Sequence, residues 1–278
     1  MPLPFGRSID LRTRTAVMGI LNVTPDSFSD GGRFDDPERA LRHAAGMVED
    51  GAGLIDVGGE STRPGSAPVG AEEEIRRVVP VIAALRARFD VPISVDTVKA
   101  EVARRALEAG ADLVNDVSAL ADPAMPQALA RSGAAAILMH MRGTPATMQL
   151  DTRYRDVVAE VAAALRGAAR RAQEAGIAGA KILLDPGIGF GKSPEGNLEL
   201  LRRLPEIVAL GHPVVVGASR KSFLGAVLGG APVDRRLEGS LACAAVAAWL
   251  GARIVRVHDV RETVRVVRTI DAIRAATV

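Results

Sequence analysis

Polar residues of scarce types stand at the ends of short apolar runs in this chain of 278 residues. The run ends carry Asn22, Asp96, Asn115, Asp185, Lys221 and His258. The whole sequence has only three asparagines, four lysines and four histidines. Carboxylates accept hydrogen bonds, amides accept and donate, and lysine donates. If the fold brings these groups together, they form a site suited to a small polar ligand.

The alternative is that each polar residue merely caps the helix that follows its run. We assign Asp26, Asp116 and Asp259 to that alternative, because an aspartate at such a position commonly fixes a turn or a helix start. Capping explains one residue at a time. It does not explain why a whole set of scarce residue types gathers at equivalent positions.

The elements that must position these residues form eight strand–helix units. Predicted strands are the apolar, often β-branched runs at 16–21, 54–57, 93–95, 113–114, 136–139, 182–184, 214–216 and 254–257. Predicted helices are the Ala-, Leu- and Arg-rich segments at 37–50, 71–88, 99–109, 123–132, 155–175, 194–209, 236–250 and 261–275. Left-handed C-terminal caps are predicted at Gly51, Gly110, Gly133, Gly176 and Gly251.

The strand runs do not alternate apolar and polar residues, which indicates burial on both faces, as in a parallel sheet. Eight such units predict a (β/α)8 barrel that forms one domain over 1–278, with a core from about 15 to 275. Functional groups of such barrels lie at the C-terminal ends of the strands. The alternative is an open doubly wound sheet, but the glycine fingerprint of a dinucleotide-binding sheet is missing.

Two long loops follow the first two predicted strands. The first runs from Val23 to Arg33 and the second covers 60–66. Both mix Pro, Gly, Ser and Thr, and both exceed the length of an ordinary strand–helix turn. We expect them to be mobile lids over the site, since plain surface loops would not explain Phe28 in the first or Arg63 in the second.

Composition excludes several classes of protein. With 48% hydrophobic and 24% charged residues, the chain suits a globular protein with a large core. A net charge of +2, spread along the sequence, argues against a nucleic-acid partner. No apolar run reaches membrane-spanning length, and the N-terminus lacks an apolar signal core. Cys243 has no second cysteine to pair with, which fits a cytoplasmic location.

Two patterns that suggest other sites fail in detail. Gly191-Lys192-Ser193 ends like a phosphate-binding P-loop, but Pro186 occupies the position of the required first glycine. No pair of histidines has the helical spacing of metal ligands, and one cysteine is too few for a structural zinc site.

Taken together, the chain resembles the dihydropteroate synthase family. The resemblance runs from about Met18 to His258, with its blocks in the family's order. The blocks are NVTPDSFSDGG at 22–32, GGESTRPG at 58–65, SVDT at 94–97, NDVS at 115–118, MHM at 139–141, DPGIGFGK at 185–192, GASRKS at 217–222 and RVHD at 256–259. Enzymes of this family join p-aminobenzoate to a dihydropterin, and the resemblance implies that reaction here.

The resemblance also implies a binding site for the pterin diphosphate. Its residues are Thr62, Asp96, Asn115, Asp185, Lys221, Arg256 and His258. The N–H groups of the pterin ring suit carboxylate acceptors. Apolar walls would come from Val117, Met139, Phe190 and Gly217, although core packing alone would explain the first three. The diphosphate implies Mg²⁺ as a cofactor with Asn22 as its ligand, since Mg²⁺ often binds through substrate phosphates and few protein groups.

For p-aminobenzoate, the resemblance implies a pocket formed by the two lids and the strand ends. Its residues are Phe28, Thr62, Arg63, Pro64, Phe190, Lys221 and Ser222. Sulfonamides should compete there. We expect a dissociative substitution in which diphosphate leaves, the ring nitrogens stabilise the methylene cation and the amine attacks. No covalent enzyme intermediate is needed, and the lids would exclude water.

Two other functions stay open at this point. A methyltransferase that passes a methyl group from methyltetrahydrofolate to a corrinoid protein shares the barrel and the pterin pocket. The intact lid motifs and Ser219-Arg220-Lys221 favour the synthase, since a methyltransferase expels no diphosphate. A non-catalytic pterin-binding paralogue would be expected to have degraded lid motifs. The family implies a homodimer, and the Ala-rich helix that carries Trp249 is a candidate contact, with packing against the barrel as the alternative.

Overall fold

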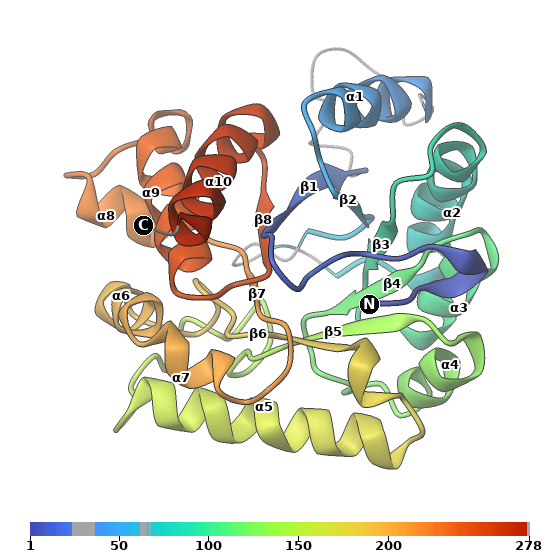
Figure 1. The fold of residues 1–278 in the computed structure, drawn as a ribbon. Coiled ribbons are helices and arrows are strands. Elements are labelled where there is room, and N and C mark those ends of the chain that lie inside the picture. Colours follow the sequence, from blue (N-terminus) through green and yellow to red (C-terminus); the bar gives the residue numbers. More distant parts are fainter. Residues whose placement is uncertain (24–36, 62–65, 67, 277–278) are drawn as a thin grey trace.

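A computed structural model describes residues 1–23, 37–61, 66 and 68–276 of the chain (Figure 1). Its strands are β1 (Ala16–Asn22), β2 (Leu54–Gly58), β3 (Ile93–Asp96), β4 (Leu113–Asp116), β5 (Ala135–Met139), β6 (Ile182–Asp185), β7 (Val215–Val216) and β8 (Ile254–Val257). Its helices are α1 (Pro37–Glu49), α2 (Ala71–Arg88), α3 (Ala100–Glu108), α4 (Met125–Ser132), α5 (Val157–Glu174), α6 (Pro194–Arg202), α7 (Leu204–Val208), α8 (Ser222–Val227), α9 (Leu237–Trp249) and α10 (Val260–Ala275). Each predicted strand is confirmed to within two residues at either end.

The strands form one parallel barrel with a ring of helices outside it. Their order is β6-β5-β4-β3-β2-β1-β8-β7, and every pairing between neighbours is parallel. A parallel bridge between Leu184 and Val214 joins the two ends of this series. The predicted (β/α)8 architecture is therefore confirmed, and the open doubly wound sheet is excluded.

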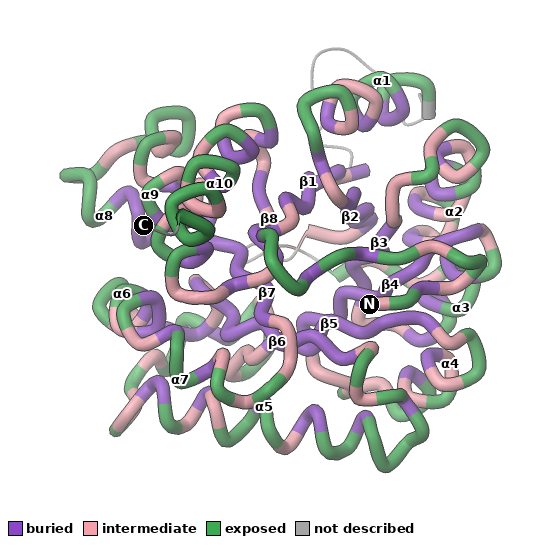
Figure 2. Tube along the Cα trace, viewed as in Figure 1, coloured by how far each residue is buried: buried purple, intermediate pink, exposed green. Residues whose placement is uncertain are grey.

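Alternate residues of each strand face the barrel interior, and the residues between them face the helices. Met18, Leu54, Leu113, Leu183, Val215 and Ile254 belong to the interior cluster. Val17, Ile55, Val114 and Val255 pack in the larger cluster that includes the helices. Because side chains alternate with a period of two, the residue two positions after each interior residue also faces inward. Each strand is therefore buried on both faces, and Figure 2 shows the strands mainly in the colour of buried residues.

Helix boundaries agree with the predictions to within two residues, except near Pro205 and at one short helix that was not predicted. The predicted helix 194–209 divides at Arg203 because Pro205 lacks an N–H and its ring crowds the preceding turn. Helix α8 was not predicted, since its six residues follow the site loop directly. All five glycines predicted as left-handed caps have positive φ, from 66° at Gly133 to 111° at Gly110.

The N-terminal segment closes the mouth of the barrel at the N-terminal ends of the strands, a feature that the sequence did not reveal. Leu3, Ile9 and Leu11 are buried in the interior cluster, and the segment lies across the barrel opening in Figure 1. Buried Asp112, just before β4, pairs with Arg7 at 2.7 Å and with Arg86 at 2.5 Å. This closure leaves the opposite mouth, at the strand C-termini, for the polar residues.

None of the helices in the described part of the chain combines the length and the apolar character that crossing a membrane requires.

Candidate active site

The strand ends place one inward-facing layer of residues at the C-terminal mouth of the barrel. By the alternation of the strands, this layer consists of Asn22, Gly58, Asp96, Asn115, Met139, Asp185, Gly217 and Arg256. A Cβ atom on Gly58 would lie 3.6 Å from Asn22 Oδ1 and 3.9 Å from Asp96 Oδ2. A Cβ on Gly217 would lie 3.7 Å from Arg256 Cβ. The two glycines thus keep space open between the polar side chains.

Arg256 is the centre of a buried hydrogen-bond network in this layer. Its Nη2 donates to Asp96 Oδ2 at 2.7 Å, and its Nε donates to Asp56 Oδ2 at 2.6 Å. Asn115 Nδ2 donates to the same Asp56 oxygen at 3.1 Å. Asp56 faces the barrel interior two residues before Gly58, so it lies one layer deeper than the site residues. From there it orients two of them, Arg256 and Asn115.

Sequence reasoning missed Asp56, although a signal was present. It is a charged residue inside the apolar run of β2 and is fully buried, with 0% of its surface exposed. Carboxylates almost never lie inside a strand buried on both faces unless a cation pairs with them. Its position two residues before Gly58 also has the parity of an interior residue. Its Oδ1 has no hydrogen-bond partner among the described residues.

Burial raises the pKa values of the two predicted pterin-binding carboxylates. Loss of water raises the pKa of Asp96, and nearby Arg256 only partly opposes this because it is shared with Asp56. Burial likewise raises the pKa of Asp185, against the effect of Lys221. Asp185 Oδ1 accepts from the backbone N–H of Gly187 at 2.6 Å, which fixes the carboxylate at the mouth of the barrel.

Lys221 extends from the loop after β7 over the loop after β6. Its ammonium donates to the carbonyl of Ile188 and lies 4.2 Å from the centre of the Phe190 ring. Burial lowers the pKa of Lys221 to about 7, with Asp185 acting in the opposite direction. The predicted neighbours Lys221 and Phe190 are thus together, and a cation–π contact joins them.

A second lysine, Lys192, stabilises the loop after β6 through hydrogen bonds to its carbonyl groups. It was not predicted as a site residue. It is 3% exposed, and its Nζ lies 3.0 Å from His140 Nδ1. The same ammonium donates to the carbonyls of Gly187 at 2.9 Å and Phe190 at 2.8 Å. Burial lowers the pKa of Lys192 to about 7 and, with Lys192 nearby, that of His140 to about 3. The signal available in the sequence was a lysine inside the DPGIGFGK block.

The loops after β7 and β8 are joined by two contacts. Ser219 Oγ lies 3.0 Å from His258 Nδ1, and Arg220 Nε donates to Asp259 Oδ2 at 3.0 Å. The prediction that Asp259 only caps α10 is wrong, because its side chain makes no cap hydrogen bond and pairs with Arg220 instead. The same prediction holds for Asp116, which accepts from the N–H groups of Ser118 and Leu120 in a turn.

The remaining predicted residues divide between the described and the undescribed parts of the chain. Val117 and Met139 are each 3% exposed, and Ser222 is the first residue of α8. Phe28, Thr62, Arg63 and Pro64, as well as Asp26, lie outside the described residues. At the edge of the second loop, Lys99 pairs with Glu60 and, at 2.6 Å, with Glu74.

The residues at the mouth fit a magnesium ion held mainly by a substrate. No cluster of three His, Cys, Asp or Glu side chains suited to a metal occurs in the described part of the chain. Asn22 Oδ1 faces the space above Gly58, and the described residues offer its amide no hydrogen-bond partner. Mg²⁺ keeps several waters and often takes one or two protein oxygens plus phosphate oxygens. Asn22 meets that requirement, whereas the described residues form no cage of protein ligands alone.

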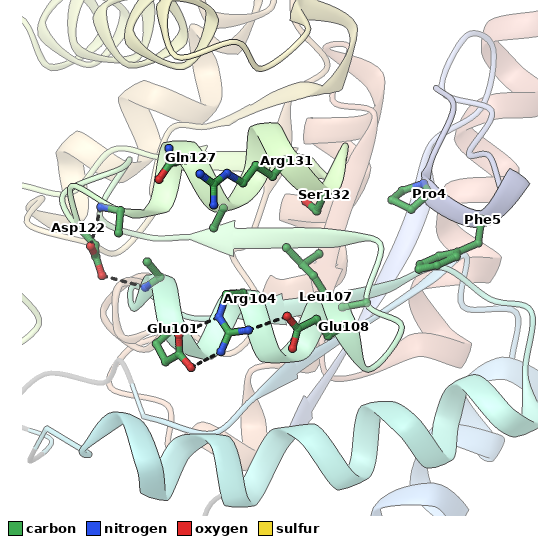
Figure 3. Close-up of a pocket in the computed structure, with 14 residues that line it drawn as sticks. Pro4, Phe5, Glu101, Arg104, Leu107, Glu108, Asp122, Gln127, Arg131 and Ser132 are labelled. Carbon is green, nitrogen blue, oxygen red and sulfur yellow. Dashed lines mark hydrogen bonds and ion pairs between the residues drawn. The ribbon is translucent and has the colours of Figure 1, made fainter.

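A separate groove of about 640 Å³ lies on the outer wall between α3 and α4 (Figure 3). Its lining includes Leu107, Ala128 and, from the N-terminal segment, Phe5. Arg104 in this groove is already paired with Glu101 and Glu108. The groove lies outside the barrel, because α3 and α4 cover the outer face of the strands. It contributes no residue to the candidate site.

Comparisons with known proteins agree with this geometry. The family model described as "Pterin binding enzyme" matches residues 18–258. The dihydropteroate synthase of Escherichia coli (strain K12) is 51% identical over 271 residues, which are 98% of this chain and 95% of the relative.

Two solved structures have the same fold. The Yersinia pestis dihydropteroate synthase in a sulfonamide drug complex superposes with a TM-score of 0.93, at 49% identity over 98% of both chains. The Xanthomonas albilineans dihydropteroate synthase with 4-aminobenzoic acid gives 0.92, at 46% identity over 98% of this chain and 97% of that one.

Proposed function

The chain belongs to the pterin binding enzyme family, among its dihydropteroate synthases, and we propose how its own residues carry out that reaction. It condenses 6-hydroxymethyl-7,8-dihydropterin diphosphate with p-aminobenzoate, which yields 7,8-dihydropteroate and diphosphate. The chain is thus a transferase of the pterinylmethyl group. The observation that carries the assignment of roles is the inward layer in which Arg256 contacts Asp96 and shares Asp56 with Asn115.

The pterin ring binds across the barrel mouth on this layer. Its amino and ring N–H groups donate to Asp185 and Asp96, while Asn115 both donates and accepts. Lys221 lies beside the ring and donates to it. Met139, Val117, Phe190 and the open position at Gly217 form the walls. Because the polar groups of such a site stay unpaired when a ligand lacks the matching hydrogen bonds, the site discriminates strongly against other bicyclic rings.

The diphosphate binds at the side of the mouth formed by β8 and β1. Arg256 and His258 face it, and Ser219 orients the His258 ring through Nδ1 at 3.0 Å. Thr62, which lies outside the described residues, would add a hydroxyl. Asn22 would hold Mg²⁺ there, which when bound neutralises charge on the leaving diphosphate. Cationic groups on this side stabilise the negative charge that develops as the carbon–oxygen bond breaks.

The amine substrate binds between the lids and the loops after β6 and β7. Phe190, with the Lys221 ammonium 4.2 Å from its ring centre, forms one described wall. Ser222 begins α8 at the same place. Phe28, Thr62, Arg63 and Pro64 would complete the pocket from the lids. The relative with 4-aminobenzoic acid bound, and the relative in a sulfonamide complex, support this assignment.

The reaction proceeds by dissociative substitution. The bond from the methylene carbon to the diphosphate oxygen breaks, and its electron pair leaves with diphosphate. Ring nitrogens and the nearby carboxylates of Asp96 and Asp185 stabilise the resulting cation. The amine lone pair of p-aminobenzoate then forms the new carbon–nitrogen bond, and the amine loses a proton. No bond to the enzyme forms at any step.

We further propose that the chain is a homodimer, joined through the face formed by α8, α9 and α10. Apolar side chains are exposed there: Val227, Leu228, Val246, Trp249 and Ile273. Val246 and Trp249 belong to α9 and Ile273 to α10, and these two helices lie side by side, since Arg274 Nη1 donates to the carbonyl of Ala248 at 2.9 Å. A set of exposed large apolar residues on adjoining helices is typical of an interface. Sedimentation should show a dimer for the wild type and a monomer for Trp249→Glu. A cytoplasmic location remains a prediction.

The function is tested by incubating the purified chain with the pterin diphosphate, p-aminobenzoate and Mg²⁺. Mass spectrometry should detect dihydropteroate only when both substrates are present, together with free diphosphate. Methyl transfer from methyltetrahydrofolate to a corrinoid, without diphosphate release, would support the methyltransferase instead. Pterin binding without any product would support the non-catalytic paralogue.

A further inference from the structure

Arg220 has a left-handed backbone between two residues of the site. Its φ is 58°, a conformation that side chains other than glycine adopt rarely and at a cost. Ser219 precedes it and contacts His258, whereas Lys221 follows it and reaches the loop after β6. The turn at Arg220 therefore decides how these two side chains are oriented relative to one another.

Ser240 of α9 and Arg236, the residue before α9, hold the backbone of Arg220 in this conformation. The Arg220 N–H donates to Ser240 Oγ at 2.9 Å, and Arg236 Nη1 donates to the Arg220 carbonyl at 3.1 Å. Ser240 is 5% exposed and donates onward to the Arg236 carbonyl at 2.7 Å. Both backbone polar groups of Arg220, its N–H and its carbonyl, are thus hydrogen-bonded from outside the loop.

The side chain of Arg220 adds a fork-shaped ion pair to Asp259. Nε donates to Oδ2 at 3.0 Å, and Nη2 donates to Oδ1. Bidentate guanidinium–carboxylate pairs fix direction as well as distance. Asp259 directly follows His258, so two neighbouring contacts join the loops after β7 and β8: Ser219 to His258, and Arg220 to Asp259.

We propose that Arg220 and Asp259 are positioning residues that set the separation between Lys221 and His258. This inference rests on the proposed function, in which Lys221 contacts the pterin ring and His258 faces the diphosphate. One substrate molecule spans both groups. With the pair intact, the loop after β7 presents Lys221 to the ring while the loop after β8 presents His258 to the leaving group. Without the Arg220–Asp259 pair, the loop after β7 and the loop after β8 rotate independently of one another.

The test compares variants that separate the backbone turn from the ion pair. Arg220→Gly keeps a backbone that adopts positive φ freely and removes the pair. Asp259→Ala removes the pair from the other side. We expect each to raise the KM for pterin diphosphate about tenfold, equivalent to about 1.4 kcal/mol, with little change in the KM for p-aminobenzoate. The double variant should be no worse than either single one. Arg220→Lys should recover part of the effect.

Arg88→Ala is the control, since it removes an exposed ion pair between Arg88 of α2 and Glu38 of α1, neither of which is a candidate site residue. It should leave both KM values unchanged. If Arg220→Gly and Asp259→Ala lower only the unfolding midpoint, or if their effects on KM add in the double variant, the inference is wrong. Absence of turnover in the wild type would overturn the proposed function, and this inference with it. Normal wild-type turnover with unchanged variants would overturn the inference alone.

Discussion

Arg256 on β8 donates from Nε to Oδ2 of Asp56 on β2 over 2.6 Å, below the layer of residues that faces the barrel mouth. The two strands lie on either side of β1 in the barrel. The pair therefore orients Arg256 toward the mouth and leaves its Nη2 for Asp96. Asp56 should act on substrate binding without touching the substrate.

Asp56→Asn tests that relationship. Removing the charge while keeping the shape leaves Arg256 with only Asp96 as a carboxylate partner. We expect the KM for pterin diphosphate to rise about tenfold and the free energy of unfolding to fall by about 1–3 kcal/mol. Steady-state kinetics and urea unfolding provide the two readouts. Asp56→Leu combined with Arg256→Met should restore stability but not activity, since a buried pair replaced by apolar groups is often neutral. Unchanged KM in Asp56→Asn would exclude the orienting role.

The lowered pKa of Lys221, about 7, predicts a pH-dependent affinity for the pterin. Below that pH the side chain is an ammonium and can donate to the ring, whereas above it the neutral amine donates less well. The plot of kcat/KM for pterin diphosphate should therefore fall on the alkaline side, with a midpoint near 7 in the free enzyme. Lys221→Arg keeps its charge at every accessible pH, so the alkaline fall should move upward in that variant. An identical profile would assign the fall to another group.

Lys192 should support the loop after β6 without contacting the substrates. Lys192→Met preserves the length of the side chain but removes the donor to His140, Gly187 and Phe190. Several buried acceptors then lose their partner, which costs about 1–3 kcal/mol for each unsatisfied group. We expect a lower unfolding midpoint together with higher KM values for both substrates, because Phe190 is proposed to line the pockets of both. Retention of wild-type kinetics at a temperature well below unfolding would contradict this role.

The closure of the opposite mouth should matter for stability alone. Ile9 is 6% exposed in the interior cluster, so Ile9→Ala should lower the free energy of unfolding by about 2–4 kcal/mol. At assay temperatures where the variant stays folded, kcat and both KM values should be unchanged. Denaturant unfolding and kinetics on the same preparation test both statements. A selective change in KM would show that the two mouths communicate.

Much of the fold could be predicted from sequence because the signals are local. Each strand contains a short apolar run, and each glycine cap follows an Ala- or Leu-rich segment. The division at Arg203 was missed, although Pro205 marks it. The N-terminal closure could not be predicted, because Leu3, Ile9 and Leu11 form neither a continuous apolar run nor a helical pattern and become core only against the barrel interior.

For the site, residues at strand ends were predictable, whereas residues that act through them were not. Asp96, Asn115 and Arg256 meet because parallel strands end at one mouth. The roles of Asp56, Lys192 and the Arg220–Asp259 pair depend on contacts between segments far apart in sequence, such as the contact of Lys192 with His140. Asp259 directly precedes a helix, so the local sequence predicts that it caps that helix. Its ion pair with Arg220 of the neighbouring loop depends on the fold and could not be predicted.

The most direct measurement is a single-turnover experiment with enzyme in excess over pterin diphosphate. Dihydropteroate and diphosphate should form in equal amounts and at equal rates, and the intact mass of the quenched enzyme should stay unchanged throughout. Asp185→Asn retains the contact with the Gly187 N–H but removes the charge, so it should slow both products by about a hundredfold or more. Release of diphosphate with a mass increase on the enzyme, or near-normal turnover by Asp185→Asn, would contradict the account.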